Sequence, residues 1–180
     1  MYWRPIATSA VILSLAVPVT VSARTNRKPT VVPYGAPVEL RIPKLSVTTK
    51  IEKTGINRQG VLEAPKNPKQ AGWYRHGAIP GKQGNAVIGG HVDWYNGPAV
   101  FRRLGQLRRG DMVEVKNDHG QVLKFRVTGV GSYYNGSVPL ARITGPTKKQ
   151  ALNLYTCTGR FNRSAKNYSH RVVVFTELVR

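Results

Sequence analysis

Glycine and proline interrupt this chain so often that they limit the length of every regular element. The 180 residues include 18 Gly and 12 Pro. Short runs rich in Val, Ile, Tyr and Phe stand between these turn-forming residues, and such runs are typical of β-strands. Seven or eight of them follow one another. We therefore predict a mainly all-β fold, a closed seven- or eight-stranded β-barrel with one or two short helices.

The individual strands are assigned from alternating apolar and polar residues or from short apolar runs. They are predicted at 38–42, 47–51, 85–91, 111–116, 121–130, 152–158 and 171–175. Residues 117–120, Asn-Asp-His-Gly, indicate a hairpin turn. The best helix candidate is 98–107, because Pro98 suits a first turn and Val100, Phe101 and Leu104 follow at helical spacing. A polar, basic loop is predicted at 159–169.

The first 37 residues differ in composition from the rest. Residues 6–23 carry no charge and Arg4 precedes them, and this apolar run is near the lower limit for crossing a membrane. Residues 1–23 are predicted to be an N-terminal membrane anchor or a cleaved signal segment, and both alternatives place the rest of the chain outside the cytoplasm. Residues 24–37 are predicted to be a basic, Pro-rich linker, and 38–180 a single β-barrel domain.

Charge is strongly unbalanced, with 28 Lys and Arg against 8 Asp and Glu, a formal net charge of +20. Such a surface suits an anionic partner: nucleic acid, acidic polymer or anionic membrane. The sequence contains no aromatic-plus-basic RNP run and no helix-turn-helix pattern, which argues against nucleic acid. One cysteine excludes a disulfide framework and a multi-cysteine zinc site. Scattered acidic residues predict no metal, and no cofactor is expected.

Cys157, the only cysteine, lies near the end of the predicted strand 152–158. Alternation places it on one face with Asn153 and Tyr155, and places Thr156 on the other. If this strand pairs antiparallel with 171–175, Cys157 and Arg171 meet at the same end. A neighbouring guanidinium lowers the pKa of a thiol and so populates the nucleophilic thiolate. A lone cysteine is also compatible with a small buried apolar residue, and the residues alone leave both readings open.

A cysteine nucleophile usually needs a histidine to exchange protons with it. The chain offers His76, His91, His119 and His170. His119 falls in the predicted hairpin turn, and His170 would point away from the adjacent Arg171. His91 ends an apolar strand after two glycines, which allow another backbone to approach closely. This placement favours His91 without excluding the others.

Two segments of this sequence resemble a known family. The run Leu154-Tyr155-Thr156-Cys157, followed by Arg171 in a Val-rich strand, resembles the Thr-Leu-x-Thr-Cys…Arg signature of sortases. Upstream, Gly90-His91-Val92-Asp93 resembles their catalytic-histidine segment. The resemblance covers nearly all of 38–180 and is nearest in character to class F, the single-protein actinobacterial group.

The resemblance implies a cysteine transpeptidase on the outer face of the cell membrane of a Gram-positive cell envelope. Cys157 would attack the Thr–Gly bond of a Leu-Pro-x-Thr-Gly (LPXTG) sorting motif and form a thioacyl enzyme. His91 would transfer protons, and Arg171 would hold the substrate or stabilise the oxyanion. An amine of peptidoglycan or lipid II would then take the acyl group.

Other residues and partners have more open roles. Thr156 and Arg160 are predicted to bind substrate, and Arg160 and Arg163 are rivals for the role of Arg171. Asp93 and Trp94 either border the groove or serve ordinary loop packing. The expected partners are surface proteins with the sorting motif, the wall amine and the membrane, with no nucleic acid, for a monomeric enzyme. The competing hypothesis is a secreted basic protein that binds anionic wall polymer or nucleic acid without catalysis.

Overall fold

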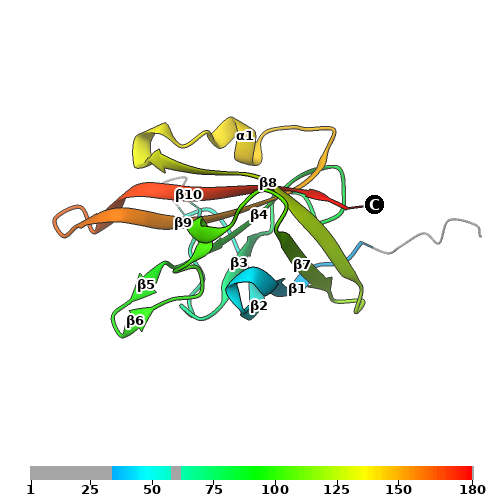
Figure 1. The fold of residues 1–180 in the computed structure, drawn as a ribbon, viewed down its shortest axis with the longest axis horizontal. Helices are drawn as coiled ribbons and strands as arrows, with labels where there is room; N and C mark the ends of the chain where they lie inside the picture. Colours follow the sequence, from blue (N-terminus) through cyan, green and yellow to red (C-terminus); the bar gives the residue numbers. More distant parts are fainter. Residues whose placement is uncertain (1–33, 58–61, 180) are drawn as a thin grey trace, which may run out of the picture. The chain divides into compact units, whose positions relative to one another are not determined.

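The computed structural model describes residues 34–57 and 62–179, so the predicted anchor and most of the predicted linker lie outside the described residues. Within them, eight strands close into a barrel in the order β1-β2-β3-β4-β9-β10-β8-β7 (Figure 1). The strands are β1 (Pro37–Ile42), β2 (Val47–Thr54), β3 (Ala71–Tyr74), β4 (Gly84–Gly90), β7 (Met112–Asn117), β8 (Val122–Tyr134), β9 (Gln150–Asn162) and β10 (Asn167–Leu178). The predicted all-β barrel is confirmed.

Two of the strand pairs are parallel, and one of them positions the site described below. β4 runs parallel to β9, and β2 runs parallel to β3. β9 and β10 form a long antiparallel hairpin, and β10 also pairs with β8. Because parallel neighbours run in the same direction, the C-terminal end of β4 lies beside residue Tyr155 of β9.

Alternation along β9 divides its side chains between two apolar clusters. Leu152 and Leu154 point into the barrel and pack in its main core, whose other large members include Phe125. Tyr155 points to the outer face and packs against a second cluster that contains Val173. The period-two pattern of residues 152–157 was therefore sufficient to predict which side chains share a face.

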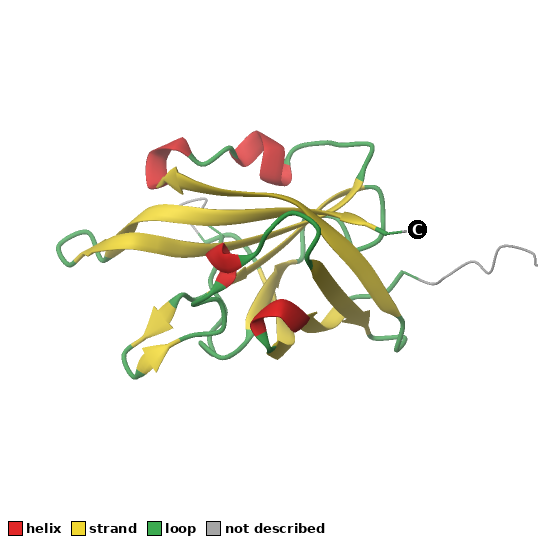
Figure 2. Cartoon of the chain, viewed as in Figure 1, coloured by secondary structure: helices red, strands yellow, loops and turns green. Residues whose placement is uncertain are grey.

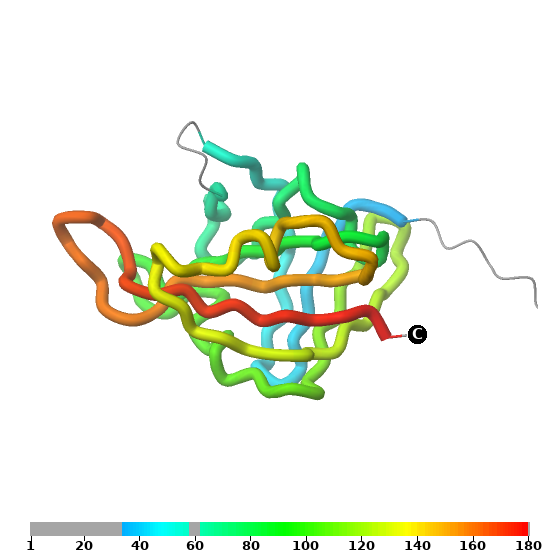
Figure 3. Tube along the Cα trace, turned by 90° about the horizontal axis from the view of Figure 1, so that it is seen from above, coloured from blue at the N-terminus to red at the C-terminus, as the bar shows by residue number. Residues whose placement is uncertain are grey.

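Helical structure is sparse and confined to the connections (Figure 2). The short helix α1 (Leu140–Thr144) lies in the connection from β8 to β9, where Ile143 is buried in the outer cluster. Seen from above, this connection runs alongside β9 (Figure 3). Three 3-10 turns, η1 (Pro43–Leu45), η2 (Leu104–Gln106) and η3 (Asn135–Ser137), complete the helical residues that the structure describes. None of these helices is long and apolar enough to span a membrane.

The helix predicted at 98–107 is wrong. Pro98 belongs instead to a small two-stranded ribbon, β5 (Asp93–Trp94) with β6 (Gly97–Pro98). Turns and η2 follow, with amide-to-carbonyl hydrogen bonds from Leu104 to Phe101 and from Leu107 to Leu104. These three side chains are buried at a spacing of three residues. That spacing suits successive 3-10 turns as well as an α-helix, so the sequence pattern did not discriminate between them.

The loop predicted at 159–169 is also different in the structure. β9 continues to Asn162 and β10 starts at Asn167, so a turn of four residues, 163–166, separates them. The far end of the β9–β10 hairpin, residues 159–169, projects past the barrel, with the β5–β6 ribbon near it (Figure 1). We call residues 159–169 the arm. The arm is polar and mostly exposed, and its strands are stabilised by backbone pairing rather than by apolar burial. Composition alone therefore indicated a loop.

Candidate active site

Cys157 and Arg171 face each other across the β9–β10 pair, as predicted. They are direct partners in the antiparallel register, and both are half-buried. The guanidinium of Arg171 is held by three acceptors at the base of the arm. Its Nη1 donates to the carbonyl oxygens of Tyr168 (3.0 Å) and His170 (2.9 Å), and its Nη2 donates to Oδ1 of Asn167 (2.7 Å). The arm therefore fixes the position of this cation beside the thiol.

His91 follows Gly90, the last residue of β4, which runs parallel to the strand that carries Cys157. The parallel register pairs Gly89 with Tyr155, and continuing it by two residues matches His91 with Cys157. The buried hydroxyl of Thr156 donates to the carbonyl oxygen of Gly90 at 2.7 Å, which ties the two strand ends together. Three neighbouring strands thus bring a histidine, a cysteine and an arginine to one edge of the barrel.

The imidazole of His91 is oriented by two contacts. Its Nε2 lies 2.9 Å from the carbonyl oxygen of Pro65, and its ring stands edge-on to Trp94 with centroids 4.9 Å apart. A carbonyl oxygen only accepts hydrogen bonds, so this contact requires the proton on Nε2. The other nitrogen, Nδ1, is then the atom that can take up and release a proton at the site.

Burial is the largest influence on the pKa of the Cys157 thiol. Burial raises the pKa of Cys157 above its ordinary value; Arg171 acts in the opposite direction and lowers it, and Asp93 raises it further. The expected effect of Arg171 is present, but desolvation outweighs it. The predicted direction of the Arg171 effect is therefore present, but the net shift of the Cys157 pKa is upward.

Asp93 joins the β5–β6 ribbon to the arm. Its carboxylate accepts a hydrogen bond from the hydroxyl of Tyr168 and lies 4.0 Å from Nη1 of Arg102. Burial and this hydrogen bond raise the pKa of Tyr168 to about 12, so the phenol stays a donor across the physiological range. Sequence reasoning singled out Asp93 only as a residue that could border the groove, and it missed Tyr168, because nothing local links two residues so far apart in the chain.

The remaining predicted residues have distinct surroundings. Thr156 is 2% exposed, so its hydroxyl contacts backbone rather than the surface. Arg160 is exposed on the arm, where its amide donates to Oγ of Ser169 at 3.0 Å, and Arg163 is exposed in the turn. His170 contacts Ser169 through Nδ1 at 2.8 Å. The two remaining histidines contact their sequence neighbours: His76 accepts a hydrogen bond from Arg75, and His119 lies beside Asp118.

A small cavity of about 110 Å³ reaches Cys157 at the mouth of the barrel. It is lined by Val92, Phe101, Arg102, Arg103, Gly105, Gln106, Thr156, Cys157, Thr158 and Val172. We call it the mouth cavity. The turn before η2 contributes two arginines, Arg102 and Arg103, to this lining. No carboxylate is among the residues that line the cavity.

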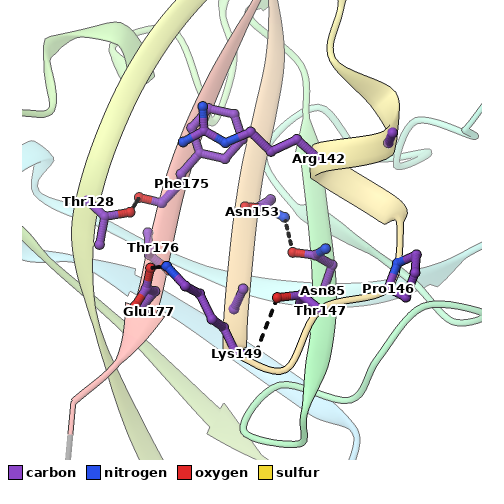
Figure 4. Close-up of a pocket in the computed structure, with 12 residues that line it drawn as sticks. Asn85, Thr128, Arg142, Pro146, Thr147, Lys149, Asn153, Phe175, Thr176 and Glu177 are labelled. Carbon is purple, nitrogen blue, oxygen red and sulfur yellow. Dashed lines mark hydrogen bonds and ion pairs between the residues drawn. The ribbon is translucent and has the colours of Figure 1, made fainter.

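A second cavity, of about 270 Å³, lies under α1 and does not include Cys157 (Figure 4). Four of its polar side chains form two pairs: Nδ2 of Asn153 donates to Oδ1 of Asn85 at 2.8 Å, and Nζ of Lys149 lies 2.6 Å from Oε1 of Glu177. The guanidinium of Arg142 stacks on the ring of Phe175 at 3.7 Å. We call it the helix cavity. Across residues 34–57 and 62–179, no group of three or more His, Cys, Asp or Glu residues could hold a metal ion.

The eight-stranded barrel thus brings one cysteine, one histidine and one arginine together at three adjacent strands, the groups that cysteine-dependent acyl transfer uses. The family model of the sortase domain matches residues 40–179. The chain therefore belongs to the sortase family, whose members are cysteine transpeptidases of the Gram-positive cell envelope. A comparison with curated proteins gives no match.

Solved structures support the same fold. A lid mutant of sortase A from Corynebacterium diphtheriae is 22% identical, with 84% of this chain and 74% of that chain covered and a TM-score of 0.61. Sortase C-1 from Actinomyces oris is 22% identical over 80% and 75%, with a TM-score of 0.60. A Clostridium perfringens sortase D5 is 18% identical over 81% and 79%, with a TM-score of 0.59. The assignment to class F stays a prediction.

Proposed function

We propose that this protein cleaves an LPXTG-type sorting motif between Thr and Gly through a thioacyl enzyme on Cys157 and passes the acyl group to a cell-wall amine. One observation carries the proposal: the strand register of β4, β9 and β10 brings His91, Cys157 and Arg171 to the same edge of the barrel. Nucleophile, proton carrier and cation are the three groups that acyl transfer from an amide requires.

The first half of the proposed reaction forms the thioester. The proton of the Cys157 thiol passes to Nδ1 of His91, and the thiolate attacks the Thr carbonyl carbon. Negative charge then develops on the carbonyl oxygen. The Arg171 guanidinium would stabilise this charge through its N–H donors. The C–N bond to Gly then breaks as His91 returns the proton to the leaving amine.

The outer face of β9 suits the apolar part of a sorting motif. Tyr155 lies two residues before Cys157 on the same face, and Val138 and Tyr133 pack in the same cluster. Gly89 leaves room for the Tyr155 ring, since a Cβ at this position would stand 2.5 Å from a ring carbon. We assign Leu and Pro of the motif to this apolar face, because burial there removes their surface from water.

The location and partners follow as part of the same proposal. The apolar segment 6–23 would tether the enzyme to the outer face of the membrane, and the basic linker 24–37 would lie close to anionic headgroups. Substrates would be surface proteins that carry the motif near their C-termini, and the acceptor would be an amine of peptidoglycan or lipid II. The class F assignment and the absence of a metal or cofactor remain parts of this proposal. Arg160 on the arm would contact the substrate, while buried Thr156 would act by positioning the end of β4.

The proposal is tested with the full chain and a library of Leu-Pro-x-Thr-Gly peptides, by mass detection of the acyl adduct. We expect an adduct equal to the peptide minus its Gly-containing portion, located on Cys157. Cys157→Ala, which removes the only thiol, should abolish cleavage and transfer. The melting temperature of this variant should stay within a few degrees of the wild-type value. Cleavage by Cys157→Ala at the wild-type rate would contradict the proposal. If the wild-type protein forms no adduct and cleaves no peptide of the library, the charge-only binding protein is favoured instead.

A further inference from the structure

We propose that the mouth cavity is the acceptor site and that it selects amines that carry a carboxylate a few bonds from the attacking nitrogen. This inference rests on the proposed function, because it concerns the second half of the same reaction. It assigns a role to Arg102 and Arg103, which neither the sequence pattern nor the chemistry of thioester formation uses.

The position of Cys157 between two unlike surfaces supports this assignment. On the outer face of β9, its neighbour Tyr155 belongs to an apolar, aromatic cluster. On the barrel side, Thr156 and Thr158 border the mouth cavity. The acyl chain and the acceptor must be present together at one thioester, so they need different surfaces. An apolar motif matches the outer face, which leaves the mouth cavity to the acceptor.

The lining of the mouth cavity is selective in charge. Arg102 and Arg103 contribute two guanidinium groups, and no carboxylate of the described residues lines the cavity. Arg102 has Asp93 as an ion-pair partner only at 4.0 Å, and its side chain is 58% exposed. Arg103 donates from Nη2 to the carbonyl oxygen of Leu45. A guanidinium has five N–H donors in a planar fork that fits a carboxylate, so each arginine retains donors for a ligand.

The size of the cavity restricts what it accepts. A volume of about 110 Å³ holds a short amino-acid end and excludes a bulky side chain. Phe101 and Val172 form its apolar wall, and Gly105 adds no side chain where η2 passes β10. The suitable acceptor is an unbranched primary amine followed within a few bonds by a carboxylate, as in glycine or glycylglycine.

The chemical step is balanced with groups already present. The neutral amine nitrogen attacks the thioester carbonyl carbon, a C–N bond forms, and the C–S bond breaks to release the Cys157 thiolate. The extra amine proton goes to Nδ1 of His91, which then reprotonates the thiolate. The two arginines bind the acceptor carboxylate and take no part in bond making, so they act through the affinity and orientation of the acceptor.

The test measures aminolysis of the preformed thioacyl enzyme in the full-length protein. The acceptors are glycylglycine and glycylglycinamide, which share the attacking amine and differ only in the terminal charge. Rates are compared at equal concentrations of the unprotonated amine. We expect glycylglycine to react about tenfold faster, since two partly exposed charge contacts contribute about that much. Raising the ionic strength to about 1 M should reduce the preference.

Variants separate the two arginines from the general positive charge. Arg102→Gln combined with Arg103→Gln should bring the ratio of the two rates close to one, and Arg103→Lys, which keeps the charge, should retain part of the preference. Arg109→Gln is the matched control. It removes a nearby exposed arginine whose Nη1 contacts the carbonyl oxygen of Thr128 and which does not line the cavity, so the tenfold ratio should persist.

The outcomes are distinguishable from a failure of the proposed function. If a thioacyl enzyme forms but reacts equally with both acceptors, the inference is overturned and the proposed function stands. The same conclusion follows if the preference survives the double substitution, or if Arg109→Gln abolishes it equally. If no peptide gives a thioacyl enzyme, the proposed function fails, and the inference fails with it.

Discussion

The helix cavity and the mouth cavity lie along the same strand, β9, yet their polar groups differ in one respect. In the helix cavity, the two asparagines and the Lys–Glu pair satisfy one another: Asn153 donates to Asn85, and Lys149 pairs with Glu177 (Figure 4). In the mouth cavity, the described residues offer Arg102 and Arg103 no carboxylate closer than the 4.0 Å contact of Arg102 with Asp93, and Cys157 lies beside them. Mutual pairing stabilises a fold, whereas cations held without close counter-charges are positioned to meet a ligand.

The comparison predicts that substitutions near Cys157 change rates, whereas substitutions in the helix cavity change stability. His91→Ala should give the largest loss, about 10²–10⁴-fold in peptide transfer, because the variant has no group to move the proton between thiol and amine. Steady-state transfer kinetics measure it. His170→Ala serves as the matched histidine control and should stay within a few-fold of wild type; a larger loss there would mean that the histidine is wrongly assigned.

Arg171→Ala should reduce transfer by about 10²–10³-fold, the usual worth of a donor aimed at an oxyanion. Arg171→Lys should recover only part of this loss, because an ammonium lacks the planar fork. The substitution to Ala also removes the cation that lowers the pKa of Cys157, so the pH profile of thiol alkylation should move upward. Arg160→Ala and Arg163→Ala are the controls, and a comparable loss in either would transfer the role to that residue.

Asn153→Leu addresses the other side of the comparison. Asn153 is 1% exposed and donates to Oδ1 of Asn85 and to the carbonyl oxygen of Ile143. The substitution strands these acceptors in the interior and should lower the free energy of unfolding by about 1–3 kcal/mol. Denaturant titration measures this loss. Transfer per folded molecule should remain near the wild-type value, and a hundredfold fall would place the helix cavity in the catalytic machinery.

Asp93→Asn should produce the smallest effect. The carboxylate raises the pKa of Cys157, so its removal should lower that pKa and increase the thiolate fraction at neutral pH. Alkylation by a small electrophile should therefore become a few-fold faster at pH 7, with a profile displaced toward lower pH. Asparagine keeps an acceptor for the Tyr168 hydroxyl, which limits structural change. An upward displacement would contradict the assigned electrostatics.

Much of this protein was determined by local patterns in the sequence. The two-residue alternation of 152–157 predicted which side chains face the core, and the Gly- and Pro-bounded runs predicted a closed barrel. The pairing of Cys157 with Arg171 followed from the lengths of two neighbouring strands, and the register confirms it. The glycines before His91 indicated the strand end that the structure places beside Cys157. These features depend on residues close in sequence.

Tertiary structure alone decided the features that depend on burial and on distant neighbours. The same spacing of Phe101, Leu104 and Leu107 was compatible with an α-helix, and only packing against the barrel selects 3-10 turns. The direction of the Cys157 pKa shift required the depth of the thiol, because desolvation competes with Arg171 and prevails. Charge counts revealed a basic protein, but they did not reveal which arginines border the mouth cavity, since that depends on where η2 crosses the strand ends.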